Sequence, residues 1–286
     1  MLRRYCGRDF PPEELALIRR LIAEDPTATR ADLSRRLCQR LGWYKADGGL
    51  KEMSARVAML RMQDDGLIAL PPPTSVRPQR RIRTTPATDP APPLELAVQH
   101  LAPLQLVPVL KRAQSCLWNE YIHRYHYLGY TTLPGAQLRY FVTAGEQLLA
   151  LLGFAASAWQ CAPRDRYIGW NHIQRTRNLH LIVNNARFLI LPWIRSKNLA
   201  SKILALAVRT LPEHWQQRYA YRPVLMETFV DTERFAGTCY RAANWQYIGQ
   251  TKGRGKLGPS GKRSVPIKDL WLYPLDPDFR RLLAVD

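Results

Sequence analysis

A proline-rich stretch, residues 71–93, constrains this 286-residue chain more than any other feature of its sequence. Eight of its 23 residues are proline and most of the others are polar, so it suits neither a helix nor a central strand. A chain of this length also exceeds what one small hydrophobic core usually holds. We therefore predict two folded domains, residues 1–71 and 98–286, joined by a linker over residues 72–97.

The charge of the chain is strongly positive and is concentrated in the second domain. There are 42 Lys and Arg residues against 23 Asp and Glu, which gives a net charge of +19. Residues 1–71 carry 13 basic and 10 acidic side chains, whereas residues 98–286 carry 25 and 11. A field of this sign attracts polyanions such as nucleic acid. We expect DNA as the partner, rather than charge kept for solubility.

Three other features narrow the class of protein. The apolar runs are far shorter than the ~20 residues that cross a bilayer, so no membrane span is expected. The N-terminal residues lack the apolar segment of an export signal, which predicts a cytoplasmic location. The five cysteines are scattered and form no Cys-x-x-Cys pair, so a zinc site is not expected.

Apolar residues at helical spacing predict three short helices in the first domain. The first has Pro11 and Pro12 in its first turn and ends near Asp25-Pro26, the second ends at Gly42, and the third follows a turn at residues 47–49. Residues 66–70 are expected to follow as a short strand. This order is that of a winged helix-turn-helix, whose third helix enters the major groove of DNA; a protein-interaction domain is the alternative. The side chains expected to contact DNA are Arg35, Arg36, Lys51, Ser54 and Arg56.

The second domain alternates between helix and strand patterns, beginning with a helix over residues 115–128 and a hairpin around Gly145. The pattern predicts an α/β domain with a mixed, largely antiparallel sheet. The later elements are expected at residues 186–193 (strand), 198–211 (helix), 223–230 (strand), 232–244 (helix), 245–249 (strand) and 269–273 (strand).

This order of elements resembles the GNAT-type N-acetyltransferases. In that family, a loop of the pattern Arg/Gln-x-x-Gly-x-Gly/Ala at a helix N-terminus holds the pyrophosphate of acyl-CoA. The similar segment here implies Arg195, Asn198 and Ala200 as cofactor-binding residues. Asn198 stands where the family has glycine, and its side chain argues against acyl-CoA. The resemblance also implies Tyr240 as a general acid, with Glu227 as a base on the preceding strand.

Whole phrases of the second domain resemble the DruA family of the Druantia anti-phage defence system. The resemblance implies a protein that works on DNA, in defence, in DNA modification of the kind made by GNAT-like Mom proteins, or in transposition, since related domains accompany transposases. The phrases that carry it include His126-Tyr-Leu-Gly129, Tyr167-Ile-Gly-Trp170, residues 184–193, Asn198-Leu-Ala-Ser201, Glu227-Thr-Phe-Val-Asp231 and residues 237–245.

Acidic residues are scarce in the basic domain, which makes Glu227 and Asp231 candidates for chemistry. Carboxylates four residues apart at a strand end could hold Mg²⁺ or Mn²⁺ for phosphodiester cleavage, although no third ligand is assigned. His126 is expected to close the cleft. Each candidate has a structural alternative, namely packing for Tyr240 and a salt bridge for Glu227.

Basic residues of the second domain fall into two groups that could hold phosphates. Arg175 and Arg187 lie in a stretch almost free of acids and interleaved with aromatic side chains, on which bases could stack. A glycine-rich basic stretch follows residue 250 and has the composition of a phosphate clamp. Its candidate residues are Lys252, Arg254, Lys256, Lys262 and Arg263.

We therefore expect a DNA-binding protein of a DruA-like defence system that acts on or modifies DNA. The first domain is expected to bind duplex DNA, and the basic domain to accept a single strand. Two alternatives remain open: a transposase-like nuclease that uses Mg²⁺ or Mn²⁺, and a non-catalytic DNA sensor that recruits other defence proteins. The sequence leaves open whether the protein is an enzyme and which cofactor it uses.

Overall fold

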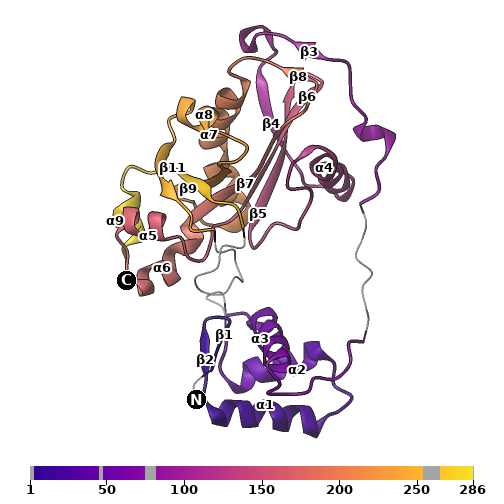
Figure 1. The fold of residues 1–286 in the computed structure, drawn as a ribbon, viewed down its shortest axis with the longest axis vertical. Helices are drawn as coiled ribbons and strands as arrows, with labels where there is room; N and C mark the ends of the chain where they lie inside the picture. The colour runs from indigo at the N-terminus through magenta and orange to yellow at the C-terminus, as the bar shows by residue number, and fades with distance from the viewer. Residues whose placement is uncertain (1–2, 45–47, 75–81, 254–264, 286) are drawn as a thin grey trace. The chain divides into compact units, whose positions relative to one another are not determined.

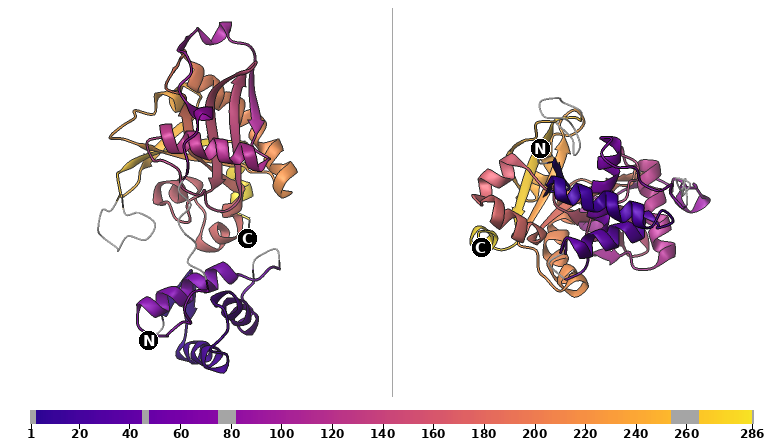
Figure 2. Two further views of the ribbon diagram at one scale, coloured as in Figure 1. Left: turned by 90° about the vertical axis from the view of Figure 1, so that its right-hand side faces the viewer. Right: turned by 90° about the horizontal axis from the view of Figure 1, so that it is seen from below.

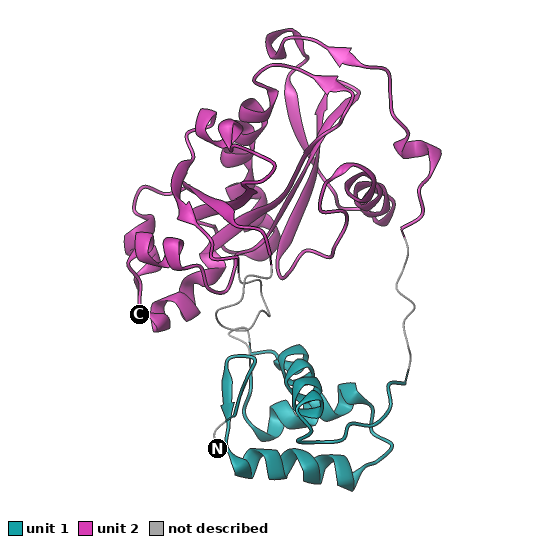
Figure 3. Ribbon diagram, in the orientation of Figure 1, with its two compact units in different colours: residues 1–81 teal, residues 82–286 magenta. Residues whose placement is uncertain are grey.

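The computed structural model describes residues 3–44, 48–74, 82–253 and 265–285. The chain forms two compact units, Met1–Arg81 and Ile82–Asp286, and each has its own hydrophobic core (Figure 1, Figure 3). The boundary between the units falls inside the stretch predicted to be a linker. No helix in the described part of the chain is long and apolar enough to cross a membrane.

Unit 1 packs three helices and a small hairpin around one core. The three helices predicted from apolar spacing are confirmed, because their apolar positions, such as Leu33 and Leu37, are buried. Thr29 caps the second helix by accepting a hydrogen bond from the Asp32 backbone N–H at 3.1 Å. The elements of this unit are β1 (Arg3–Tyr5), β2 (Arg8–Phe10), α1 (Pro12–Glu24), α2 (Arg30–Arg40) and α3 (Glu52–Asp64).

The strand predicted at residues 66–70 is wrong. Gly66 adopts a φ of 71°, and the Leu67 N–H donates to the Met62 carbonyl, so the chain turns out of α3. The Leu70 N–H then donates to the Gln63 side chain instead of to a partner strand. In the described part of unit 1, the hairpin therefore lies before α1 and not after α3.

Unit 2 is built on a seven-stranded sheet in the order β10-β11-β9-β7-β6-β5-β4. All neighbouring strands are antiparallel except β7 and β9, which are parallel. The predicted mixed α/β fold with a largely antiparallel sheet is confirmed. The strands are β4 (Leu104–Pro108), β5 (Gln137–Ala144), β6 (Gln147–Ala156), β7 (Ile182–Ile190), β9 (Leu225–Asp231), β10 (Gln246–Gln250) and β11 (Lys268–Pro274).

One face of this sheet, called here the α7 face, is covered by α7 (Leu199–Tyr219) and α8 (Thr238–Ala242) (Figure 1, Figure 2). Tyr140 on β5 stacks on His214 of α7, with 5.8 Å between ring centroids. Thr228 on β9 lies 3.4 Å from the hydroxyl of Tyr240 on α8. These contacts fix which side chains of the sheet point toward the two helices.

The opposite face, called the α4 face, is covered by α4 (Arg112–Tyr125) and by three short helices whose bounds are given at the end of this paragraph. Trp118 of α4 packs so closely on Gly153 of β6 that a Cβ at residue 153 would lie 3.0 Å from the indole. A separate core cluster that includes Ile168, Leu270 and Phe279 continues this face beyond β9. The helices here are α5 (Ala162–Ile168), α6 (His172–Asn178) and α9 (Phe279–Leu283).

Two predicted helices differ in length from the observed ones. The helix predicted over residues 232–244 begins only at Thr238, because the Arg234 and Phe235 N–H groups bond the Asp231 carbonyl in a turn. The helix predicted over residues 198–211 runs on to Tyr219. The sequence prediction lacks β4, α5, α6 and α9.

Residues 82–97, predicted as part of the linker, belong to unit 2 and pack on the rest of it. Thr88 is buried and donates a hydrogen bond to Glu120 of α4 at 2.7 Å, and Tyr125 donates to the Thr88 carbonyl. The short elements of and around this segment are the 3₁₀ turns η1 (Pro86–Thr88), η2 (Val98–His100) and η3 (Leu179–Leu181), with β3 (Leu94–Glu95) paired to β8 (Ile194–Arg195).

The parallel pair at the centre of the sheet is short. Residues 182–184 of β7 pair with residues 225–227 of β9, and the parallel ladder ends there. A bulge at Ala186 then places Arg187 opposite Gly153, on the α4 face. The α4 face beside the end of this short ladder is therefore where Arg187 of β7 and Asp231 of β9 lie.

Candidate nucleic-acid interface

The four predicted catalytic residues lie on both faces of the sheet. Glu227 and Asp231 share the α4 face, since residues an even number apart on a strand point the same way. His126 ends α4 and lies on that face too. Tyr240 lies on the α7 face against Thr228. The structure therefore brings His126 and the two carboxylates to one face and leaves Tyr240 on the other.

Glu227 is fully engaged in a buried ion pair. Its Oε2 accepts a hydrogen bond from Arg164 Nη1 at 2.9 Å, and its Oε1 accepts one from the Ala158 backbone N–H at 2.8 Å. The side chains of Glu227 and Arg164 are both 0% exposed, and Asp165 binds the other side of the guanidinium at 2.9 Å. Burial would lower the Arg164 pKa, but the two carboxylates outweigh burial and raise it. Both Glu227 oxygens are thus occupied by the fold.

Tyr240 is buried in the α7 face. Its ring packs against Trp245 with 5.2 Å between centroids, and the residue is only 7% exposed. Burial raises the pKa of its hydroxyl, so the group stays protonated at neutral pH. The arrangement is that of a packing residue with a satisfied hydroxyl.

A second group of charged side chains on the α4 face, the Arg187 cluster, is built from four elements. His126 and Tyr127 follow α4, Arg187 follows the bulge in β7, and Asp231 ends β9. Lys268 of β11 lies directly opposite Asp231 in the antiparallel ladder. Arg234, in the turn after β9, completes the cluster with its Nε 3.9 Å from Asp231 Oδ2. Lys268 and Arg234 thus lie beside the carboxylate of Asp231, and Arg187 acts on His126 and Tyr127.

Arg187 is a buried cation without a carboxylate partner in the described part of the chain. It is 9% exposed, and burial lowers its pKa. Its Nη1 donates to the Ala186 carbonyl and its Nη2 to Thr131 Oγ1, both at 2.7 Å, while its buried Nε meets no acceptor among the described residues. A guanidinium in this setting is desolvated but not neutralised.

His126 is held neutral beside this cation. Burial lowers its pKa to about 4, and the positive charges of Arg187 and Lys268 act in the same direction. Its Nδ1 accepts a hydrogen bond from the Leu128 N–H at 3.2 Å. The potential at this point of the α4 face is therefore positive, despite the carboxylate of Asp231.

Aromatic side chains border the Arg187 cluster and are exposed. Tyr127 and Phe235 meet edge to face, 5.2 Å between centroids, and are 36% and 50% exposed. The Arg234 guanidinium lies over the Tyr127 ring at 5.3 Å. The sequence analysis did not name Tyr127, Phe235 and Lys268 as site residues, because their proximity depends on the register of β9 and β11. A phenylalanine in a polar turn was the one sequence feature that could have indicated a binding surface here.

The predicted cofactor loop begins α7. Asn198 adopts the left-handed conformation, with a φ of 65°, at the N-cap of the helix, so the backbone has the shape that glycine gives. Its Cβ and amide nevertheless stand at the helix terminus, where a pyrophosphate needs open backbone N–H groups. Arg195 is exposed and pairs with Glu95 at 3.1 Å, and Ala200 lies in the first turn of α7. The side chains present do not fit acyl-CoA here.

The other residues of unit 2 that were predicted to contact phosphates differ in exposure and in whether an acidic residue pairs with them. Arg175 is only 11% exposed, pairs with Asp165 at 3.4 Å and stacks on Trp159, so the fold already uses its charge. Lys252 is exposed. Arg254, Lys256, Lys262 and Arg263 lie outside the described residues.

The predicted DNA contacts of unit 1 lie on α2 and α3. Arg35 and Arg36 are exposed and pair with Asp32 at 2.5 Å and Asp25 at 2.9 Å. Lys51, Ser54 and Arg56, at the start of α3, are partly exposed. Across the described residues, no group of three or more His, Cys, Asp and Glu side chains is placed to hold a metal ion.

Solved acetyltransferases are similar to part of this chain. A variant of the spermidine N-acetyltransferase SpeG from Vibrio cholerae is 13% identical, with a TM-score of 0.40 over 63% of this chain and 98% of that one. An acetyltransferase of Bacillus subtilis in complex with CoA is 8% identical, with a TM-score of 0.31 over 48% and 76%. An N-acetyltransferase from Staphylococcus aureus is 11% identical, with a TM-score of 0.32 over 49% and 68%.

No curated protein sequence matches this chain. A sequence model of one family, described as Druantia protein DruA, matches residues 75–268. The match covers more than half of the chain and includes every residue of the Arg187 cluster. The chain therefore belongs to the DruA family of Druantia proteins.

Proposed function

We propose that this Druantia anti-phage protein binds nucleic acid through the Arg187 cluster of unit 2, with a backbone phosphate held by Arg187. The observation that carries the proposal is the buried guanidinium that meets no carboxylate in the described chain. Removing a charge from water without a counterion is costly, and a phosphate would supply both the negative charge and an acceptor for the free Nε.

The surroundings of Arg187 favour a polynucleotide over a small anion. Lys268 and Arg234 extend the positive charge to either side of Asp231, and the exposed rings of Tyr127 and Phe235 lie next to them. Bases stack on exposed aromatic rings while cations follow the backbone in proteins that bind single strands. We therefore assign a single-stranded segment to this surface.

The proposed role is binding and recruitment of other Druantia proteins rather than chemistry on DNA. Two of the side chains that catalysis would need are engaged by the fold, because Arg164 and the Ala158 N–H occupy Glu227 and because Tyr240 is buried. A sensor needs only the charged and aromatic surface that remains.

The experiment compares the full-length chain with Arg187→Gln and with Arg209→Gln, a control that removes the same charge from an exposed position on α7. Affinity for a labelled 20-nucleotide single strand is measured from 50 to 300 mM salt. Arg187→Gln is expected to bind about tenfold more weakly and to reduce the salt slope by about 1, as loss of one phosphate contact requires. Equal affinity of the two variants would contradict the proposal.

The same incubations with Mg²⁺ or Mn²⁺ separate binding from cleavage. An intact strand on a denaturing gel, together with a shift on a native gel, is the expected result. Fragments or a protein-linked strand would overturn the non-catalytic role and restore Asp231 and its neighbours as candidates for chemistry.

We also propose that unit 1 docks on duplex DNA through the start of α3, as a helix-turn-helix would. Lys51 and Arg56 are partly exposed there and form no ion pair with another described residue, in contrast to the paired Arg35 and Arg36 on α2. Lys51→Glu is expected to weaken binding of a 20-base-pair duplex and to leave single-strand binding unchanged. Loss of both affinities together would contradict separate roles for the two units.

A further inference from the structure

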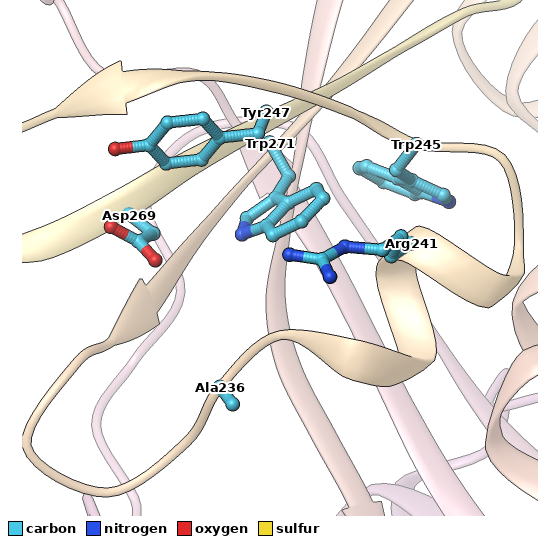
Figure 4. A pocket seen from close by; sticks show the side chains of 6 residues that line it. All are labelled: Ala236, Arg241, Trp245, Tyr247, Asp269 and Trp271. Carbon is cyan, nitrogen blue, oxygen red and sulfur yellow. The ribbon is translucent and has the colours of Figure 1, made fainter.

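A hollow of about 330 Å³ lies on the α7 face at the β10–β11 edge (Figure 4). The Arg187 cluster belongs to the opposite face of the sheet. Trp271 pairs with Thr228 across the sheet and with Tyr247 at the edge, which places both rings on this face. The residues that line the hollow are Ala236, Arg241, Trp245, Tyr247, Asp269 and Trp271.

Trp271 forms a rigid aromatic wall of the hollow. It is 3% exposed, and Gly237 packs directly on its indole, since a Cβ at residue 237 would lie 2.8 Å from Cζ2. Tyr247 meets Trp271 edge to face at 5.5 Å and is itself 51% exposed. One ring is thus fixed by packing while the other remains open to a planar ligand.

Polar groups in the hollow are placed beside these rings. The buried Nε1 of Trp271 meets no acceptor among the described residues, and Figure 4 shows it turned toward the side of the hollow that carries Asp269. Asp269 Oδ1 accepts a hydrogen bond from Gln250 at 3.0 Å. The wall of the hollow therefore contains an unused N–H donor, buried beside Gly237, and a carboxylate acceptor, next to an aromatic surface.

Arg241 decides the charge of the ligand. Its guanidinium lies 5.9 Å from the centre of the Trp271 ring and so takes the place that a ligand cation would occupy on that ring. A quaternary ammonium or a methylated lysine is disfavoured, although aromatic cages with an acid often bind such groups. A neutral planar heterocycle with both acceptor and N–H groups fits the donor, the carboxylate and the rings together.

We infer that this hollow takes a nucleobase, stacked on Tyr247 and hydrogen-bonded by Trp271 Nε1 and Asp269, with Arg241 placed for the attached phosphate. The base comes either from a polynucleotide strand or from a free nucleotide. The inference rests on the proposed nucleic-acid function only where the base comes from a strand. A site for a free nucleotide would not depend on that function, because the hollow and the Arg187 cluster lie on opposite faces of the sheet.

The test uses the fluorescence of 2-aminopurine, which stacking on an aromatic ring quenches. Two probes are titrated into the full-length chain: free 2-aminopurine deoxyribonucleoside monophosphate, and a 12-nucleotide single strand with 2-aminopurine at its centre. The variants are Tyr247→Ala, at a half-exposed edge position, and Trp271→Phe, which keeps a ring and removes the N–H. Trp215→Phe, at a buried position of α7, is the matched control.

Saturable quenching of at least one probe by the wild-type chain is expected, with a dissociation constant about tenfold higher for Tyr247→Ala and Trp271→Phe and unchanged for Trp215→Phe. Quenching of the strand alone supports a base from a polynucleotide, and quenching of both probes supports a nucleotide site. No quenching by the wild type, or equal quenching by Tyr247→Ala, overturns the inference. Arg187→Gln should weaken binding of the strand and leave binding of the free nucleotide unchanged. Failure of the phosphate site at Arg187 is therefore distinguishable from failure of the base site in the hollow.

Discussion

Two buried arginines on the α4 face of the same sheet differ in whether a carboxylate neutralises their charge. Arg164 is 0% exposed and meets two carboxylates, Glu227 and Asp165, at 2.9 Å each. Arg187 is 9% exposed and meets a carbonyl and a hydroxyl but no carboxylate in the described chain. The carboxylates raise the pKa of Arg164, whereas burial without a counterion lowers that of Arg187.

The comparison separates charge used for the fold from charge left for a ligand. A buried cation with a full set of partners has no remaining capacity, so it holds α5 to β9 and does little else. A buried cation without a counterion raises the free energy of the folded state, and an anionic ligand would remove that cost. The charge of Arg164 therefore belongs to the core, and the charge of Arg187 belongs to the interface.

The largest expected effect follows from removing the partner of Arg164. Glu227→Gln leaves a fully buried guanidinium with one carboxylate instead of two, and loss of a buried partner typically costs about 3–5 kcal/mol. The urea transition of unit 2 is the measurement, and Glu95→Gln, which removes a carboxylate from an exposed pair, is the control. Normal stability together with lost function would make Glu227 a residue of the chemistry and break the comparison.

The pH dependence of stability should report on the Arg187 cluster. The pKa of His126 is about 4 in the folded chain, against 6.5 in the unfolded chain. Below pH 6.5 His126 therefore becomes protonated in the unfolded chain while it stays neutral in the folded chain. The free energy of unfolding falls as the pH is lowered, and the loss is complete below pH 4. The full difference is about 3 kcal/mol.

His126→Gln is the variant that isolates this dependence. The difference in unfolding free energy between wild type and variant should change between pH 7 and pH 4 and stay constant from pH 7 to pH 8. Parallel curves throughout would mean that neither burial nor the charges of Arg187 and Lys268 lower the pKa of His126 in the folded chain.

A smaller effect of opposite sign is expected at Arg187 itself. Arg187→Met removes an uncompensated buried charge, so stability should stay the same or rise, while single-strand affinity falls about tenfold, or about 1.4 kcal/mol. Stability and affinity are measured on one preparation, by urea unfolding and by fluorescence anisotropy. A large loss of stability would show that Arg187, like Arg164, is used by the fold.

Much of the fold could be predicted from local patterns. Leu33 and Leu37 on α2, and the apolar runs of β7 and β9, mark their elements because burial repeats with the period of a helix or a strand. The strand expected at residues 66–70 failed because the positive φ of Gly66 ends α3 in a turn, and a turn of this kind has the same composition as the start of a strand.

The candidate site was only partly accessible to the same reasoning. Asp231 and His126 could be named as isolated residues, but Lys268 joins them only through the antiparallel register of β11 on β9. The partner of Glu227 could not be named, because Arg164 lies 63 residues earlier in the chain on a helix absent from the prediction. Trp271 and Tyr247 meet through the register of β10 on β11, which the sequence does not specify.

The smallest effect is expected at Arg195, which supplies a third kind of arginine for the comparison. Its side chain is 76% exposed and pairs with Glu95, itself 61% exposed, at 3.1 Å. Exposed pairs contribute about 0–1 kcal/mol, because water already solvates both charges, so Arg195→Ala should change stability by less than about 0.5 kcal/mol. Single-strand affinity should change only through net charge, by much less than for Arg187→Met. A tenfold loss in Arg195→Ala, measured by the same anisotropy titration, would move the nucleic-acid surface to the start of α7 and show that exposure, rather than an uncompensated charge, marks the interface.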